Sequence, residues 1–273
     1  MAIEPLSELK KICWKETETV WYAKYFIRHL SIRVTRMILP LGISANQATL
    51  IGIIIGILAC ILIGTGSIVY SILGVGLLQL SYIFDCVDGE IARYKKQSSV
   101  NGIFIDFIGH EVLIPFSFLA LTFFLYNNVH QTSILLLGVL AAWSSTSPTG
   151  KAKGNVLLNL LGRRSFSYFD YSKLSGGVKS KNHDFNEKSI LSSFFLAVFY
   201  YPGSMNIISV MTLLYFFYPS MVLISAQIYF SAHILLQIYL PIKWYRQNSV
   251  EKDFLSLRDK VLKTYKDQKS QKS

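Results

Sequence analysis

The sequence predicts an all-α integral membrane protein, in which six transmembrane helices follow an N-terminal amphipathic helix at the membrane interface. Hydrophobic residues make up 52% of the 273-residue chain and charged residues only 16%, which is unlike an average soluble domain. Several apolar stretches approach the roughly 20 residues that a helix needs to cross a bilayer. The basic residues are also confined to alternate connections between those stretches.

Six apolar stretches are expected to cross the membrane. They are residues 46–66, 69–84, 103–126, 133–146, 189–217 and 219–242. The fifth stretch is interrupted by Tyr201-Pro202-Gly203, and proline inside a helix removes a hydrogen bond and kinks or breaks the helix. We therefore expect a juxtamembrane piece before the fifth span.

The distribution of positive charge supports a count of six spans. Lys and Arg number seven before the first span, three at 93–96, eight at 151–188 and nine from 243 onward. The other connections contain none, so six spans place every basic residue on one side, whereas four or seven would not. Basic connections face the cytoplasm, which predicts that both termini are cytoplasmic. The net charge of +11 then reflects contact with membrane lipids, and we expect no nucleic-acid partner.

The chain is expected to form one membrane domain over residues 1–245, followed by a polar cytoplasmic tail at 246–273. The first 41 residues (1–41) mix aromatic, aliphatic and basic side chains, which is typical of a juxtamembrane helix in the interface. Residues 147–188 are polar and are predicted to form a cytoplasmic loop longer than most connectors. The cysteines are too widely spaced for a disulfide framework or a zinc site. They are Cys13, Cys60 and Cys86.

An acidic cluster lies between two of the apolar stretches. Between residues 19 and 169 the carboxylates are Asp85, Asp88, Glu90, Asp106 and Glu111. Ionisable side chains at membrane depth are costly and mostly face a cavity or a partner. In one interpretation the cluster is structural, with a carboxylate that pairs with Arg93 or caps a helix. The spacing of the residues favours a site.

Two helical stripes carry these residues. At 100° per residue, Asp85 and Asp88 fall on one face of a helix. The second stripe steps by four residues and consists of Gly102, Asp106 and His110. The link between the stripes is basic and polar and belongs at the cytoplasmic surface. The two helices are therefore expected to be antiparallel neighbours whose stripes converge on the cytoplasmic side.

Converging carboxylates repel one another unless cations lie between them. Hard divalent ions with oxygen ligands remove the repulsion, and Mg²⁺ usually keeps positions open for phosphate oxygens. Two such ions can clamp a transferring phosphoryl group. The small residues Gly89 and Ala92 leave room for a nucleotide to approach the backbone. The pattern thus indicates phosphoryl-transfer chemistry with divalent cations.

The two stripes closely resemble the signature of the CDP-alcohol phosphotransferases, integral membrane enzymes that make phospholipid headgroups and related phosphodiesters. The chain reads Asp85-x-x-Asp88-Gly89-x-x-Ala92-Arg93, then eight residues, then Gly102-x-x-x-Asp106-x-x-x-His110. The family signature is D-x-x-D-G-x-x-A-R, seven or eight residues, G-x-x-x-D-x-x-x-D. Seven of its eight fixed positions match. The spacing of Asn46 and Thr49 after Pro40 is similar to the family's P-N-x-x-T, with the proline displaced.

The resemblance implies a cofactor and a set of site residues. In such enzymes two divalent cations, Mg²⁺ or Mn²⁺, bind the diphosphate of a CDP-linked donor. The positions that match metal ligands are Asp85, Asp88, Asp106 and His110. The positions that match or adjoin the nucleotide pocket are Gly89, Ala92, Arg93, Ser99, Asn46 and Thr49. Relatives are commonly homodimers, so a homodimer is expected here.

His110 departs from the family pattern, in which the last Asp contacts the second metal and accepts the proton of the acceptor alcohol. One interpretation is that His110 does both, since imidazole ligates metals and titrates near neutral pH. A second is that Glu111 replaces the Asp, although one residue of helix turns it about 100° away from the stripe. A third is that the second metal or the base is lost and the activity is altered.

The predicted reaction is attack of an acceptor hydroxyl on the phosphorus distal to cytidine, with CMP as the leaving group. CDP-diacylglycerol and a soluble CDP-alcohol both fit as donors, and the site should face the cytoplasm. A membrane prenyltransferase is an alternative, because such enzymes also bind magnesium diphosphate through aspartates. They normally use two acidic clusters, and spans four to six here carry none. A divergent, non-catalytic membrane protein of the same fold is a further alternative.

Overall fold

The computed structural model describes residues 4–14, 22–97, 99–146, 154, 198–199, 202–249, 252–253 and 255–256. Throughout these residues the regular structure is helical and contains no strand, as predicted. Apart from Gly154, the predicted loop at 147–188 lies outside them, as does most of the tail. The chain divides into two compact units, residues 1–146 with 186–231 and residues 147–185 with 232–273. The single domain over 1–245 stays a prediction.

Each of the six predicted apolar stretches contains a helix. The helices are α3 (Ala45–Gly64), α4 (Ile68–Tyr94), α5 (Val100–Val129), α6 (Thr132–Ser145), α10 (Gly203–Tyr215) and α11 (Pro219–Arg246). Four of them, α3, α4, α5 and α11, are long and apolar enough to cross a membrane. By contrast, α6 has 14 residues and α10 has 13, which is short of the roughly 20 that a span requires. The exact count of six spans stays a prediction.

The N-terminal segment is also helical. It contains α1 (Leu6–Cys13), a π-helical turn η1 (Ala23–Ile27), α2 (Arg28–Ile38) and a 3₁₀ turn η2 (Leu39–Leu41). One face of α2 is buried through Ile32 and Ile38, and another exposes Arg33, Arg36 and Met37. This amphipathic pattern agrees with the predicted juxtamembrane helix, whose location at a membrane interface stays a prediction.

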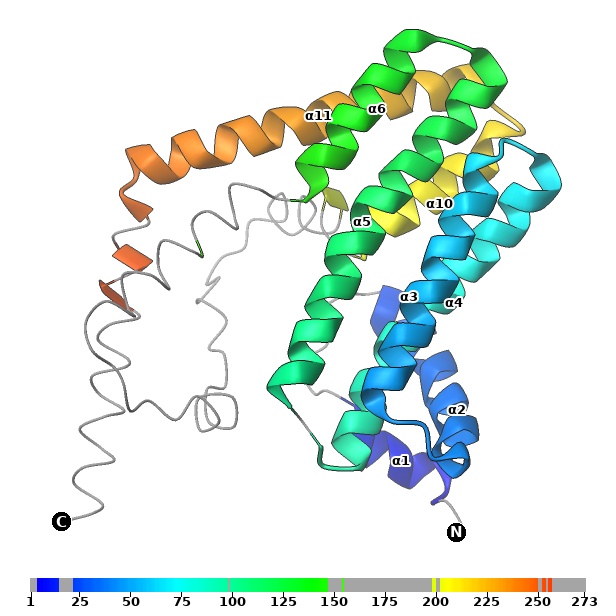
Figure 1. Ribbon diagram of the computed structural model, residues 1–273, viewed down its shortest axis with the longest axis vertical. Helices are drawn as coiled ribbons and strands as arrows, with labels where there is room; N and C mark the ends of the chain where they lie inside the picture. The colour runs from blue at the N-terminus through cyan, green and yellow to red at the C-terminus, as the bar shows by residue number, and fades with distance from the viewer. Residues whose placement is uncertain are drawn as a thin grey trace. The chain divides into compact units, whose positions relative to one another are not determined.

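Glycines bring α3, α4 and α5 close together. The three helices run beside one another (Figure 1). A Cβ atom at Gly52 would lie 3.0 Å from the Cβ of Phe84, and one at Gly74 would lie 2.8 Å from the carbonyl oxygen of Ala59. The Ser81 hydroxyl donates to the Gly52 carbonyl over 2.8 Å. Small residues at such positions let helix backbones approach closely, so α4 lies against α3 with little space between them.

A polar network joins α4 to α10 and to the start of η1. The Gln79 amide donates to Asn206 Oδ1 at 3.3 Å and to the Ser209 hydroxyl at 3.1 Å. Its carbonyl oxygen accepts from the Tyr22 hydroxyl at 3.0 Å. Such bonds between apolar helices satisfy polar groups that would otherwise be costly to bury. They hold α10 against the middle of α4.

Glu90 ties α2 to α4 and has a structural role. Its side chain is fully buried. The Ser31 hydroxyl donates to Oε1 at 2.6 Å, the Thr35 hydroxyl donates to Oε2 at 2.7 Å, and Arg28 Nη1 lies 3.5 Å from Oε1. A buried carboxylate is tolerated when hydrogen bonds and an opposite charge surround it. Glu90 therefore has a structural role, which was one interpretation of the acidic cluster, although its cation is Arg28 and not the expected Arg93.

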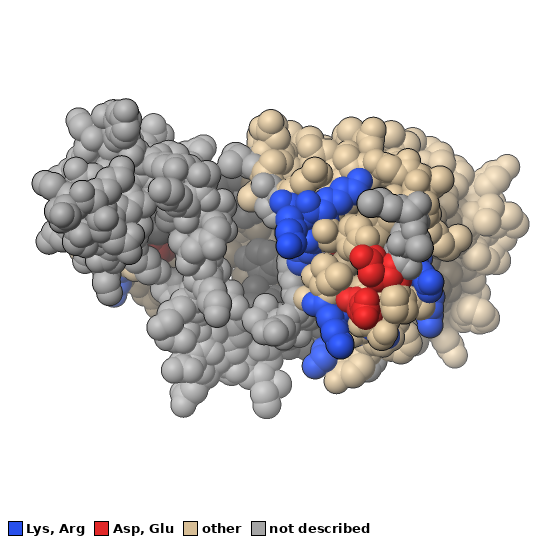
Figure 2. Space-filling model, turned by 90° about the horizontal axis from the view of Figure 1, so that it is seen from below, with Lys and Arg blue, Asp and Glu red and all other residues tan. Residues whose placement is uncertain are grey.

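Basic side chains gather at the end of the molecule where α1, α2 and the turn after α4 lie. Seen from that end, Lys and Arg surround a smaller acidic group (Figure 2). The exposed basic residues of these elements are Lys11, Arg33, Arg36 and Lys96. This arrangement agrees with the predicted gathering of positive charge on one side, while the cytoplasmic assignment stays a prediction.

Substitution of Gly74 by Ala should destabilise the protein, because the new methyl group would meet the backbone of α3. Overpacking of this kind typically costs about 1–3 kcal/mol. The matched control is Gly76→Ala, two residues along the same helix, where an added Cβ meets nothing within 4 Å. The control should be neutral or stabilising by up to about 1 kcal/mol. Thermal unfolding in detergent compares the two, and equal melting temperatures would contradict close packing at Gly74.

Substitution of Glu90 by Ala should also destabilise the fold, because it removes the acceptor of two buried hydroxyls and the counter-charge of Arg28. Removing one partner of a buried pair costs roughly 3–5 kcal/mol. Exposed Glu8→Ala is the control and should change stability by about 0.5 kcal/mol or less. Unfolding followed by circular dichroism in detergent measures the stability of both variants. A Glu90→Ala protein as stable as the Glu8→Ala protein would show that the buried network contributes nothing.

Candidate functional site

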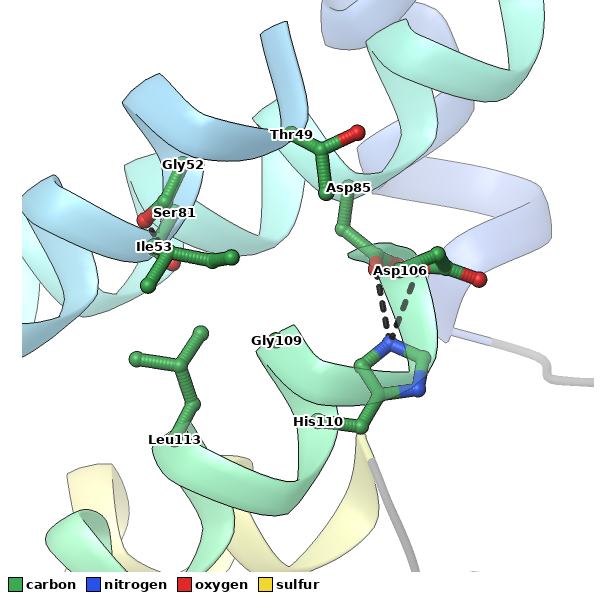
Figure 3. A pocket seen from close by; sticks show the side chains of 9 residues that line it. All are labelled: Thr49, Gly52, Ile53, Ser81, Asp85, Asp106, Gly109, His110 and Leu113. Carbon is green, nitrogen blue, oxygen red and sulfur yellow. Dashed lines mark hydrogen bonds and ion pairs between the residues drawn. The ribbon is translucent and has the colours of Figure 1, made fainter. Parts of the chain in front are cut away.

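Three side chains from two helices converge at the predicted site. Asp85 comes from α4, and Asp106 and His110 come from α5 (Figure 3). His110 Nε2 lies 2.8 Å from Asp85 Oδ1 and 3.6 Å from Asp106 Oδ1. The side chains are 24%, 45% and 30% exposed for Asp85, Asp106 and His110 respectively. The cluster is thus partly buried and accessible from one side.

Local sequence explains why these residues meet. Ser99 begins α5 as its N-cap, and its hydroxyl accepts from the Gly102 N–H at 3.0 Å. The stripe of Asp106 and His110 follows, since residues four apart lie on the same helix face. The turn between α4 and α5 reverses the chain, with Lys96 in the left-handed region at φ 52°. The converging stripes predicted from the sequence are therefore present for these side chains.

Asp88 has a different environment from the other three. It is 8% exposed, and the Thr49 hydroxyl of α3 donates to its Oδ2 at 2.6 Å. It lies within Coulombic range of Asp85 and Asp106. Among the described residues, however, the group whose donor atoms all lie within 4.8 Å of one another consists of Asp85, Asp106 and His110. Metal ligation by Asp88 stays a prediction.

A pocket extends from the cluster between α3, α4 and α5 (Figure 3). It is lined by Thr49, Gly52, Ile53, Ser81, Asp85, Asp106, Gly109, His110 and Leu113. Five of these residues were not predicted from the sequence, namely Gly52, Ile53, Ser81, Gly109 and Leu113. The spacing Gly52-x-x-x-Gly56 was the available signal, because it marks a helix face that packs closely.

Arg93 and Gly89 lie together, as the motif predicts, although Arg93 also contacts the N-terminal segment. A Cβ at Gly89 would lie 3.2 Å from Arg93 Nη1. Arg93 Nε donates to the Cys13 carbonyl at the end of α1, and its buried Nη2 has no hydrogen-bond partner. Ala92 lies one turn after Asp88 on the same helix. Nucleotide binding by these residues stays a prediction.

Asn46 and Ser99 both lie beside Gly102. A Cβ at that glycine would be 3.2 Å from Asn46 Oδ1 and 3.2 Å from the Ser99 hydroxyl. The start of α3 and the start of α5 therefore meet where the motif has a fixed glycine. Two residues assigned to the nucleotide pocket are neighbours as a result, but their binding role also stays a prediction.

The three clustered donors fit a divalent cation. Ligands of Mg²⁺ lie about 2.1 Å from the ion, so two adjacent ligands of an octahedral ion are about 3 Å apart. The distances of 2.8 and 3.6 Å from His110 Nε2 to the two carboxylates are close to that separation. Partial exposure leaves coordination positions for water or phosphate oxygens. The trio can therefore hold a metal ion with small side-chain adjustments.

Glu111 and Cys13 lie near these elements but not in the trio. Glu111, the alternative to His110, is half-buried on α5 and is not among the three clustered donors. Burial raises the pKa of the Cys13 thiol to about 11. A thiol that stays protonated at neutral pH is a poor nucleophile and metal ligand.

Comparison with protein families supports the predicted resemblance. Residues 42–153 match the model of the family described as CDP-alcohol phosphatidyltransferase. The matched segment contains both motif stripes and the start of α3, and the resemblance predicted from the sequence is confirmed. A search of curated proteins gave no match.

Substitution of Thr49 by Val should weaken the attachment of α3 to α4, because it removes the hydroxyl that donates to Asp88. A hydrogen bond to a charged group contributes about 1.5–3 kcal/mol. The control is Thr212→Val, where the lost hydroxyl of a buried residue donates to a carbonyl of its own helix. This control should cost about 1 kcal/mol. Thermal unfolding in detergent measures both, and an equal loss in the two variants would contradict the assigned importance of the Thr49–Asp88 bond.

Proposed function

Because residues 42–153 match the model of the CDP-alcohol phosphatidyltransferase family, we propose that the chain transfers a substituted phosphate group from a CDP-linked donor to an acceptor hydroxyl and releases CMP. The observation that carries the proposal is the convergence of Asp85, Asp106 and His110 on one pocket. The acceptor alcohol stays open, and both CDP-diacylglycerol and a soluble CDP-alcohol fit as donors. The product would be a phospholipid or a related phosphodiester.

Three side chains would hold the divalent cation, Mg²⁺ or Mn²⁺, that this chemistry requires. They are Asp85, Asp106 and His110, with Asp88 near enough to contribute charge. A cation bound there supplies positive charge to the diphosphate of the donor and to the leaving CMP. If two ions bind, as the family resemblance implies, Asp88 would be a further ligand, and its Oδ1 would be available while Oδ2 accepts from Thr49.

The chemical step forms one P–O bond and breaks another. The acceptor oxygen bonds to the phosphorus distal to cytidine, the bond from that phosphorus to the CMP oxygen breaks, and the hydroxyl loses a proton. The Nε2 atom of His110 faces both carboxylates, and its single lone pair can either bind the ion or accept a proton. His110 is therefore the proposed proton acceptor only when Nε2 does not hold the ion, and one of the carboxylates beside it is the acceptor otherwise.

Other residues would orient the nucleotide. Arg93 lies against Gly89 and has an Nη2 with no hydrogen-bond partner. Because that nitrogen is buried, the side chain would have to move for the guanidinium to bind a phosphate. Asn46 and Ser99 place polar groups where α3 and α5 begin. We propose that this end of the helices faces the cytoplasm, as the distribution of Lys and Arg predicts, and that the protein is a homodimer, as the resemblance implies.

Purified protein in detergent should release CMP from CDP-diacylglycerol or another CDP-alcohol when an acceptor and Mg²⁺ or Mn²⁺ are present. Asp106→Asn should reduce the rate about 100-fold or more, because lost electrostatic stabilisation commonly has an effect of that size. Asp106 is the most exposed member of the trio, so its substitution should leave the fold intact. Exposed Glu8→Gln is the control and should retain full activity.

The alternatives give different results in the same assay. Diphosphate release from a prenyl donor, without CMP release from any CDP-alcohol, would indicate a prenyltransferase. Absence of turnover across a panel of alcohols and donors, in protein shown to be folded, would indicate a non-catalytic protein of the same fold. Metal-independent CMP release that survives Asp106→Asn would exclude the assigned site.

A further inference from the structure

The candidate metal site differs from an all-oxygen site by one nitrogen. Two of the three clustered donors are carboxylate oxygens and the third is His110 Nε2. The nitrogen is not peripheral, because it lies 2.8 Å from one carboxylate and 3.6 Å from the other. Any ion that both aspartates bind would therefore meet the imidazole as well.

Contacts with neighbouring helices orient the His110 side chain. Its neighbour Gly109 packs against Ile53 of α3. A Cβ atom added at Gly109 would lie 3.1 Å from the Ile53 side chain. The ring is held across the helix interface by Asp85 from α4. The close-up shows Nε2 as the ring atom directed at both carboxylates (Figure 3). A ligand that is already oriented loses little entropy when it binds.

Divalent ions respond differently to this nitrogen. Mg²⁺ binds carboxylates, carbonyls and water, whereas imidazole suits later ions such as Ni²⁺, Cu²⁺ and Zn²⁺. For a given mixed site the affinity rises from Mn²⁺ through Co²⁺ to Cu²⁺. An imidazole in place of a carboxylate should thus favour Co²⁺ and Zn²⁺ over Mg²⁺. It also removes one negative charge, which weakens binding of a hard ion further.

We propose that His110 is a specificity-determining metal ligand, which makes the Asp85–Asp106–His110 site select later first-row divalent ions over Mg²⁺. The inference concerns the same site as the proposed function and rests on it for the role of the metal. It does not depend on turnover, since the selectivity is a property of binding. It assigns Nε2 to the ion, so the proton acceptor of the proposed reaction would be another group.

The test compares binding of Co²⁺ and Mg²⁺ to chelator-treated protein in detergent, by calorimetric titration and by competition. The main variant is His110→Asp, which replaces the nitrogen by a third carboxylate. The ratio of Co²⁺ to Mg²⁺ affinity should fall by about tenfold or more, because even residues that only orient a ligand change metal affinity 10–100-fold. The visible absorption of bound Co²⁺ should also change as nitrogen is replaced by oxygen.

His130→Asn is the matched control. This histidine ends α5 in the left-handed region at φ 56°, which Asn tolerates well. It lies 20 residues from His110 along the same helix, about 30 Å away at 1.5 Å per residue. Its loss should leave the affinity ratio and the Co²⁺ spectrum unchanged, and a change would mean that the probe reports histidines outside the site.

A second variant keeps the inference testable if the His110→Asp protein does not fold. His110→Ala removes the nitrogen without adding charge and should weaken Co²⁺ binding much more than Mg²⁺ binding. An unchanged affinity ratio in the folded variants, preference of the native protein for Mg²⁺, or failure of Co²⁺ to bind would each overturn the inference. Selective Co²⁺ binding without CMP release would leave the inference standing and overturn the proposed function. CMP release together with an unchanged ratio of Co²⁺ to Mg²⁺ affinity in the variants would support the proposed function and overturn the inference.

Discussion

The site depends on how closely α3, α4 and α5 approach one another. Side chains of aspartate and threonine reach only a few ångströms from the backbone, so they meet across helices only where the helix axes are near. Gly52 lies against Phe84, and Gly109 lies against Ile53. A larger residue at either glycine would push the helices apart, because protein interiors are close-packed. The hydrogen bond from Thr49 to Asp88 and the contacts of His110 with Asp85 and Asp106 depend on this close approach of the helices.

Electrostatics then decides how the carboxylates are accommodated. Charged groups removed from water are costly unless hydrogen bonds or opposite charges surround them. Thr49 donates to Asp88, and His110 lies between Asp85 and Asp106. The same positions are those at which the family resemblance implies cations. The cluster thus has neighbouring protein groups that contact its carboxylates, and His110 is one of them.

Glu90 shows that residues inside a functional motif also serve the fold. It occupies a variable motif position two residues after Asp88, and its buried carboxylate attaches α4 to α2 through Ser31 and Thr35. Arg93 is bonded to the end of α1 from the same helix. The N-terminal helices are therefore attached directly to the segment that carries the predicted ligands, and their packing contributes to the geometry of the site.

The sequence by itself determined which segments are helical and which residues share a helix face. Each predicted apolar stretch contains a helix among the described residues, and the stripe of Asp106 and His110 follows from the helical period, because both signals are local. Only the tertiary structure decided that Asp85 meets His110 while Asp88 is bonded by Thr49. That outcome depends on the rotation of each helix about its own axis, which contacts between residues far apart in the chain determine.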